Sequence, residues 1–256
     1  MAEFAHEDLA GAEFTDVRLP GARFRNVDLS GSQFRSVSLN GCVLRGCDLR
    51  NLTLDGWVQD LMINGVQVGP LIEAELDRRY PERLKLRPTD PDGFRKAWDL
   101  ITELWAGTVE RASRLPPALL HESVDEEWSF IQTLRHLVFA TDAWVARAIL
   151  GQPAPWDALD LPHDEMPDIP GVPRNLMVRP SLPEVLELRT DRQALVRRVI
   201  DELTDERLAA KTEPVTEPGY PESISFSVRG CLLGVLDEEW AHRQYAERDL
   251  AVLASR

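Results

Sequence analysis

The stretch FTDVRLPGARFRNVDLSGSQF (residues 14–34) carries a large apolar side chain at every fifth position. An α-helix would spread residues five apart around its whole circumference, and a strand would send them alternately to its two faces. A chain that turns a corner every five residues would instead direct all of them toward one axis. The spacing continues without a slip through Phe4, Leu9, Phe14, Leu19, Phe24, Leu29, Phe34, Leu39, Leu44, Leu49 and Leu54.

A compact residue stands two positions before most of these large side chains, and the other positions are polar, charged or glycine. This pattern resembles that of the pentapeptide-repeat family. The resemblance covers residues 2 to about 55 and implies a short right-handed quadrilateral β-helix, which we assign to residues 1–56. Cys42 and Cys47 take the compact inward position, so we expect them to be buried apolar residues rather than redox or metal groups.

Residues 57–90 lose the five-residue period and are predicted to link two domains. The Asn-Gly pair within LMINGVQV (residues 61–68) predicts a β-hairpin, because both residue types accept the positive φ of a tight turn. GPLIEAELDRRY (residues 69–80) predicts a short helix, and a proline-rich connector follows it.

Residues 91–256 carry four amphipathic segments that predict an all-α four-helix bundle, so the expected fold class is mixed. Ser129 and Ser181 stand at expected helix N-caps. The 151–180 segment holds seven prolines and is either a functional lid or a strap across the bundle. Residues 213–226 are expected to form a β-like excursion. The predicted helices are residues 92–115, 129–150, 182–203 and 227–256.

Composition excludes several classes of protein. The 256-residue chain has a net charge of −14, which argues against general nucleic-acid binding because phosphate neutralisation requires clustered Lys and Arg. No apolar run is long enough to cross a membrane, and residues 1–20 lack the pattern of a secretory signal. Three cysteines do not make a disulfide framework. We therefore expect a cytoplasmic protein that binds neither nucleic acid nor membrane.

Two histidines lie inside predicted helices of the bundle. His136 is flanked by apolar residues, and His242 follows Glu238 by four positions, so the last two share one helix face. Taken alone, the first pattern is typical of a core histidine and the second of a solvated pair. A ligand role for these residues needs a further indication.

That indication comes from EWSFIQTLRHLVFATDAW (residues 127–144) together with EEWAHRQYAERDL (residues 238–250). Both resemble the DinB/YfiT-like family of metal-binding four-helix bundles, and the resemblance spans roughly residues 91–254. It implies a divalent metal ion (zinc, iron or nickel) held by His136, Glu238 and His242. Glu238 stands where the family usually has a histidine.

The carboxylate need not destroy such a site. Two histidines and one carboxylate form a valid catalytic ligand set for zinc or for iron(II). Glu239 is an alternative to Glu238, because it lies nearer the centre of the apolar face on a helical wheel. It could be the ligand, support another ligand, or form an ion pair with Arg243.

A weaker candidate group lies in LPHDEMPD (residues 161–168). His163 and Asp164, together with Glu165, could carry protons above a metal centre if this segment were a lid. Ordinary polarity of an exposed loop explains the same residues equally well.

The family resemblance implies a metal-dependent enzyme that acts on a small-molecule substrate. The expected chemistry is that of a low-molecular-weight-thiol (mycothiol-type) S-transferase, or of a related hydrolase or lyase. The alternative is a non-catalytic interaction or adaptor protein, with a degenerate metal site and a repeat used for protein contacts. The sequence is compatible with a homodimer.

Overall fold

The protein is described from a computed structural model that covers residue 4 and residues 7–56, 58–164 and 166–256. The chain forms two compact units, Met1–Cys47 and Asp48–Arg256, and each is considered by itself. The first unit thus ends at Cys47, whereas the five-residue period predicts a repeat that ends at residue 56.

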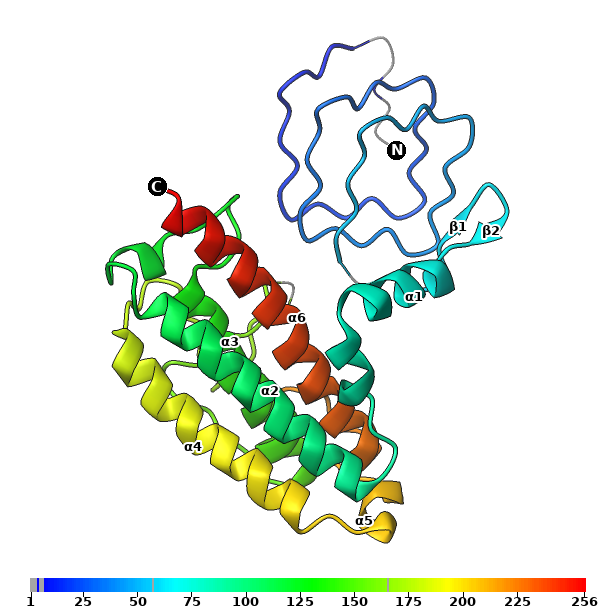
Figure 1. The fold of residues 1–256 in the computed structure, drawn as a ribbon. Coiled ribbons are helices and arrows are strands. Elements are labelled where there is room, and N and C mark those ends of the chain that lie inside the picture. The colour runs from blue at the N-terminus through cyan, green and yellow to red at the C-terminus, as the bar shows by residue number, and fades with distance from the viewer. Residues whose placement is uncertain (1–3, 5–6, 57, 165) are drawn as a thin grey trace. The chain divides into compact units, whose positions relative to one another are not determined.

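The first unit changes direction every five residues, as the period of its sequence predicts. Gly11, Gly21, Gly31 and Gly41 lie at the turns with φ between 70° and 76°. Midway between these turns stand bends at residues such as Asn26, whose φ is 53°. Figure 1 shows the result as a series of angular, four-sided loops. The corners predicted from the repeat are therefore present.

The predicted β-helix is not confirmed. Among the described residues of the first unit there is no strand, and the backbone hydrogen bonds close turns, as from Ala22 N to Leu19 O (3.1 Å). The repeated large side chains stay exposed, Phe24 to 67%. The prediction that Cys42 and Cys47 are buried is wrong, because both are exposed. Without a hydrogen-bonded ladder to draw neighbouring coils together, a side chain at a corner has no adjacent coil to pack on.

The first regular element of the second unit is the predicted hairpin. Strands β1 (Met62–Ile63) and β2 (Val66–Gln67) pair antiparallel, with Ile63 opposite Val66. Asn64 and Gly65 both have positive φ, 49° and 82°, as a two-residue turn requires. Helix α1 (Gly69–Arg79) follows, and the expected connector contains the 3₁₀ helix η1 (Pro81–Leu86).

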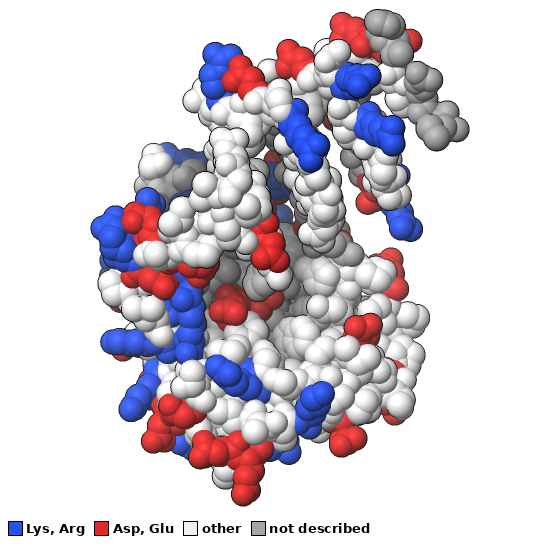
Figure 2. Space-filling model, turned by 90° about the vertical axis from the view of Figure 1, so that its right-hand side faces the viewer, with Lys and Arg blue, Asp and Glu red and all other residues white. Residues whose placement is uncertain are grey.

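Four charged side chains join α1 to the residues after it. Arg83 pairs with Asp77 and Glu73 at 2.9 Å each, and Arg87 reaches the same two acids. On the face drawn in Figure 2, Lys and Arg side chains are likewise interspersed with Asp and Glu. Many of the charged surface side chains therefore have an oppositely charged neighbour, as in these four ion pairs.

The bundle contains the four predicted helices. They are α2 (Pro91–Ala112), α3 (Phe130–Thr141) with its π-helical continuation η3 (Asp142–Ile149), α4 (Leu182–Asp201) and α6 (Val228–Ala254). Shorter helical segments are η2 (Leu119–His121) and α5 (Asp205–Ala209). Ser129 and Ser181 each form a capping box, which satisfies two orphan backbone donors at the start of α3 and α4.

The core lies between these helices, and α3 packs against both α4 and α6 (Figure 1). Side chains with almost no exposure fill it, among them Trp98, Ile101, Leu134, Leu137 and Leu232. Within the described residues, no helix combines the length and the apolarity needed to span a bilayer.

A buried arginine of α3 holds the 151–180 segment, which we call the strap. Arg135 is 0% exposed, and its guanidinium donates to the carbonyls of Leu159 (2.7 Å), Asn175 (2.9 Å) and Val178 (3.3 Å). The sequence leaves open whether residues 151–180 form a functional lid or a strap across the bundle. These hydrogen bonds to α3 favour the strap.

A second buried arginine holds a second loop. Arg147 of η3 is 1% exposed and donates to the carbonyl of Pro153 in the strap. It also donates to the carbonyls of Val215 (3.4 Å) and Glu217, which belong to residues 213–226. We call these residues the excursion. Lys211 and Ser227 form an antiparallel bridge at its base, in line with the β-like character predicted for it.

We expect Arg135→Ala to lower the free energy of unfolding by about 3–5 kcal/mol, because it removes three hydrogen bonds from a charged donor and leaves a cavity at a fully buried position. Urea denaturation of the full chain measures this change. The control is Arg229→Ala, which alters an exposed arginine of α6 and should change stability by less than about 0.5 kcal/mol. Equal effects of the two substitutions would contradict the role assigned to Arg135.

Candidate metal centre

His136 of α3 is 4% exposed, and both of its ring nitrogens are engaged. Nδ1 lies 3.0 Å from the carbonyl oxygen of Leu161. Since a carbonyl can only accept, Nδ1 carries the proton and donates it to Leu161. Nε2 therefore presents its lone pair on the opposite side of the ring, which is the form of histidine that binds a metal.

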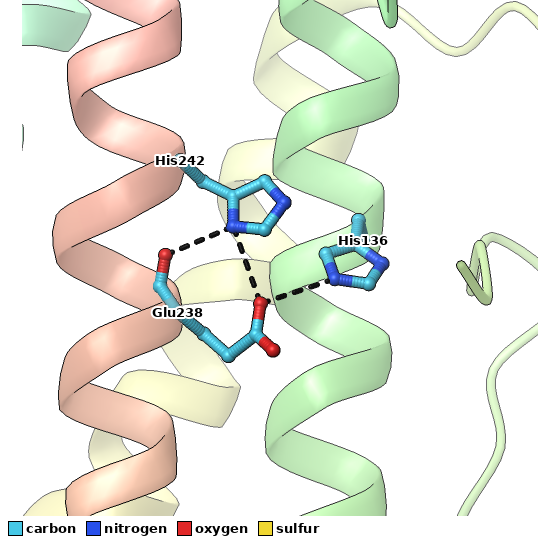
Figure 3. A group of neighbouring side chains, drawn as sticks. All are labelled: His136, Glu238 and His242. Atoms are coloured by element: carbon cyan, nitrogen blue, oxygen red, sulfur yellow. Dashed lines mark hydrogen bonds and ion pairs between the residues drawn. The ribbon is translucent and has the colours of Figure 1, made fainter. Parts of the chain in front are cut away.

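Glu238 of α6 faces that lone pair. Its Oε2 lies 3.3 Å from His136 Nε2 (Figure 3). With His136 neutral and Glu238 ionised, both atoms are hydrogen-bond acceptors, and two acceptors this close require a cation or a proton between them. This observation supports the suitability of the site for a metal ion.

His242 completes the cluster from the next turn of α6. Its Nδ1 lies 3.0 Å from the backbone oxygen of Glu238 and 3.2 Å from Glu238 Oε2. The spacing of four residues places both side chains on one helix face. One ligand atom from each of His136, Glu238 and His242 lies within 4.8 Å of the others. Within the described residues this is the group of side chains whose geometry could hold a metal ion.

The surroundings of His136 and Glu238 favour the protonation states in which these residues bind metal ions. Burial lowers the pKa of His136, against the opposing effect of Glu238, so the imidazole is neutral at neutral pH. Burial alone would raise the pKa of Glu238, but the neighbouring rings of His136 and His242 favour its ionised form and bring the pKa well below its ordinary range. A neutral imidazole and an ionised carboxylate are the states that coordinate divalent ions.

Aromatic rings cover the cluster. The ring centroid of Trp128 lies 4.7 Å from that of His136 and 6.1 Å from that of His242, and Phe139 lies 6.1 Å from His136. Trp128 Nε1 is buried and has no hydrogen-bond partner among the described residues. A buried N–H without an acceptor beside the cluster would suit a polar group bound there.

Glu239, the alternative ligand, points elsewhere. It is 2% exposed, and its Oε1 and Oε2 lie 3.2 Å and 2.9 Å from Nη2 of Arg189 on α4. Arg189 in turn lies over the ring of Trp105. Of the alternatives open for Glu239, an ion pair is the one formed, but with Arg189 rather than Arg243, and the carboxylate that faces the two histidines is that of Glu238.

His163 and Asp164 lie on the strap and not in the cluster. The His163 ring is 5.4 Å from Tyr220 of the excursion. The backbone carbonyls of His163 and Asp164 accept hydrogen bonds from Arg174 at 3.0 Å and 3.3 Å. Glu165 lies outside the described residues.

One acidic pair, formed by a residue of η3 and a residue of the strap, is buried and was not predicted from the sequence. Asp142 and Asp160 are 1% and 0% exposed, and Arg192 forms a two-pronged ion pair with Asp142 at 2.6 Å and 3.0 Å. Asp160 stands between Leu159 and Leu161, whose carbonyls hold Arg135 and His136. The available signal was an aspartate at position 142 among the mostly apolar residues of LVFATDAWVA (residues 137–146).

Burial, followed by repulsion from Asp142, raises the pKa of Asp160 far above its ordinary range. Asp160 therefore keeps a proton at neutral pH. An uncharged carboxyl costs less to bury than a carboxylate, which explains how this acid can stand without an ion pair of its own.

Comparison with known families gives two matches. The family described as the DinB superfamily matches residues 100–246, a span that contains His136, Glu238 and His242. Pentapeptide repeats, in eight copies, match residues 2–31 and 28–56. No curated protein and no solved structure gives a significant match to the chain.

We expect the contribution of Asp160 to the free energy of unfolding to fall as pH rises above about 3.9, the ordinary pKa of aspartate. Above that pH the unfolded chain loses the proton that folded Asp160 retains, so unfolding becomes more favourable by up to about 1.4 kcal/mol per pH unit. Asp160→Asn removes this titration, and its unfolding free energy should depend less on pH between 5 and 7.

Denaturant titrations at several pH values measure both slopes. Asp168→Asn, at an exposed aspartate of the strap, is the control and should keep the slope of the unchanged protein. Parallel slopes for the unchanged protein and Asp160→Asn would show that Asp160 is already ionised in the folded state.

Proposed function

The chain belongs to the DinB superfamily, and from this premise we propose that its helical unit is a metal-dependent enzyme with His136, Glu238 and His242 as ligands. The observation that carries the proposal is the approach of Glu238 Oε2 to His136 Nε2 at 3.3 Å. Because Leu161 already takes the Nδ1 proton, either a second proton on His136 or a metal cation is needed between these two atoms, and we propose the cation.

The donor set suits a divalent ion such as zinc, iron or nickel. When bound, such an ion would leave a coordination position open and lower the pKa of a water or thiol placed there. Glu238 adds a negative charge that three histidines would lack, so this acidification would be weaker than with three neutral imidazoles. Trp128 and Phe139 pack beside His136, which is buried, whereas the side chain of Glu238 stays 35% exposed, so the cluster is open to solvent on the side of Glu238.

We propose that the reaction is the transfer of a low-molecular-weight thiol (mycothiol-type), or a related hydrolysis or elimination, on a small-molecule substrate. In this scheme His163 and Asp164 accept or return protons above the centre. Support comes from the position of His163 beside Tyr220, at the edge of a cavity lined by both.

The alternative is an adaptor in which the helical unit has lost its metal. The glutamate in the middle ligand position and the exposed apolar side chains of the repeat favour it. The two proposals differ in one measurable property, which is the stoichiometric binding of a divalent ion.

We expect elemental analysis of untagged protein, purified without chelators, to find about one divalent ion per chain. His136→Ala and His242→Ala should each weaken zinc binding by more than about 100-fold, since even the loss of a residue that orients a ligand costs 10–100-fold. His121→Ala, outside the cluster, is the matched control and should retain the ion. Folded protein that holds no ion and takes up none from a zinc titration would favour the adaptor.

We also propose that the repeat mediates protein contacts, the simplest being a homodimer. Large apolar side chains exposed at a regular spacing are typical of interaction surfaces, and Phe14, Phe24 and Phe34 are 61–67% exposed. We expect Phe14→Ser with Phe24→Ser to weaken self-association by at least about 10-fold in sedimentation equilibrium. Gln33→Ser, at another exposed position of the repeat, should not change it. A chain that is monomeric at all concentrations would contradict this role.

A further inference from the structure

A cavity of about 360 Å³ opens where the strap, η3 and the excursion meet. Its lining includes Trp144 of η3, His163, Met166 and Ile169 of the strap, and Tyr220 and Phe226 of the excursion. This volume falls within the range of pockets that bind small organic molecules. We propose that the cavity binds an uncharged, flat aromatic compound carrying a hydrogen-bonding substituent, and that such compounds are the substrate class of the proposed enzyme.

The cavity is formed by segments that are firmly held. Arg147 binds carbonyls of both the strap and the excursion, so it fixes the two walls relative to each other. Gly219, which also lines the cavity, leaves room for the Arg147 guanidinium. A Cβ at this position would lie only 2.7 Å from the guanidinium and would clash with it. Arg135 ties the rest of the strap to α3. The hollow therefore exists before any ligand enters, which reduces the entropic cost of binding.

The walls suit a flat π-system. Trp144 meets the rings of Tyr220 and Phe226 nearly edge-on, with centroids 5.9 Å and 5.3 Å away and interplanar angles of 77° and 89°. Met166, which is 3% exposed, adds a polarizable sulfur. Perpendicular rings offer both a face and an edge to an aromatic guest, and thioethers pack favourably on such rings.

The polar groups of the lining indicate an uncharged guest with a hydrogen-bonding substituent. Burial raises the pKa of Tyr220, so its hydroxyl remains a donor at neutral pH. The His163 ring lies 5.4 Å from the Tyr220 ring and offers a second polar contact. Glu222 also lines the cavity, and its carboxylate would repel an anion.

One ring separates this cavity from the metal cluster. The centroid of Phe139 lies 6.1 Å from that of His136 and 5.8 Å from that of Tyr220. Trp156 stacks on the same ring at 5.5 Å. A compound bound in the cavity would therefore lie close to the cluster. The role of substrate rests on the proposed function, but binding to the cavity does not.

The test uses the full chain and 2-naphthol as the probe, with binding followed by calorimetry in the presence of zinc and again after chelation. We expect saturable binding under both conditions. Ile169→Trp fills the cavity and should weaken binding at least 10-fold. Tyr220→Phe keeps the ring but removes the donor, and should weaken binding of 2-naphthol 3- to 10-fold while leaving that of naphthalene unchanged. Leu176→Trp, at a strap position 49% exposed and outside the lining, is the matched control.

The charge preference has its own probe. 2-Naphthalenesulfonate should bind at least 10-fold more weakly than 2-naphthol, and equal or tighter binding would overturn the assignment to uncharged compounds. Failure of 2-naphthol to bind, or binding that neither Ile169→Trp nor Tyr220→Phe weakens, would overturn the site itself.

The two proposals can fail separately. A protein that binds 2-naphthol in the cavity but takes up no metal ion keeps the binding site and loses the proposed enzyme function. A protein that binds the ion but not the probe keeps the metal centre and loses the aromatic substrate class.

Discussion

The buried guanidinium of Arg135 is the contact on which the rest of the site depends. It holds the strap by the carbonyl of Leu159, two residues before the carbonyl of Leu161 that receives the His136 proton. Fixing the first carbonyl positions the second, and the second decides which nitrogen of His136 faces Glu238. The orientation of His136 on α3 thus depends on a loop without regular secondary structure. The loop can hold this position because the arginine supplies donors to three of its backbone carbonyls.

For three of the acidic side chains buried in the helical unit, the cost of burial is reduced, in two cases by an arginine and in one by retention of the proton. Glu239 pairs with Arg189, and Asp142 pairs with Arg192. Asp160 is buried in its protonated form. Because an uncompensated buried charge is costly, such groups occupy well-defined positions and hold their neighbours in place. The two ion pairs join α4 to α6 and to η3, so they hold in place the helices that carry the candidate ligands.

The repeat presents the opposite situation. Its five-residue period produces corners at the expected positions, but its large side chains remain exposed because no backbone ladder joins the coils among the described residues. A corner is a local property that glycine and asparagine can specify, since both tolerate positive φ. Burial of the large side chains, in contrast, requires contact between neighbouring coils. In the helical unit the local preferences are supported by a packed core, whereas in the repeat they are not.

Local features follow from the amino-acid sequence: the corners of the repeat, the Asn64–Gly65 hairpin, the capped helices of the bundle, and the pairing of Glu238 with His242 on one face. These depend on residues at most a few positions apart. The choice between Glu238 and Glu239 depends instead on packing between helices, because it is Arg189 of another helix that binds Glu239. The role of the strap was likewise decided by Arg135 and Arg147, which bind its carbonyls from α3 and η3. Every residue has the same backbone carbonyl. The pattern of side chains in the sequence therefore does not predict which carbonyls a buried arginine will bind.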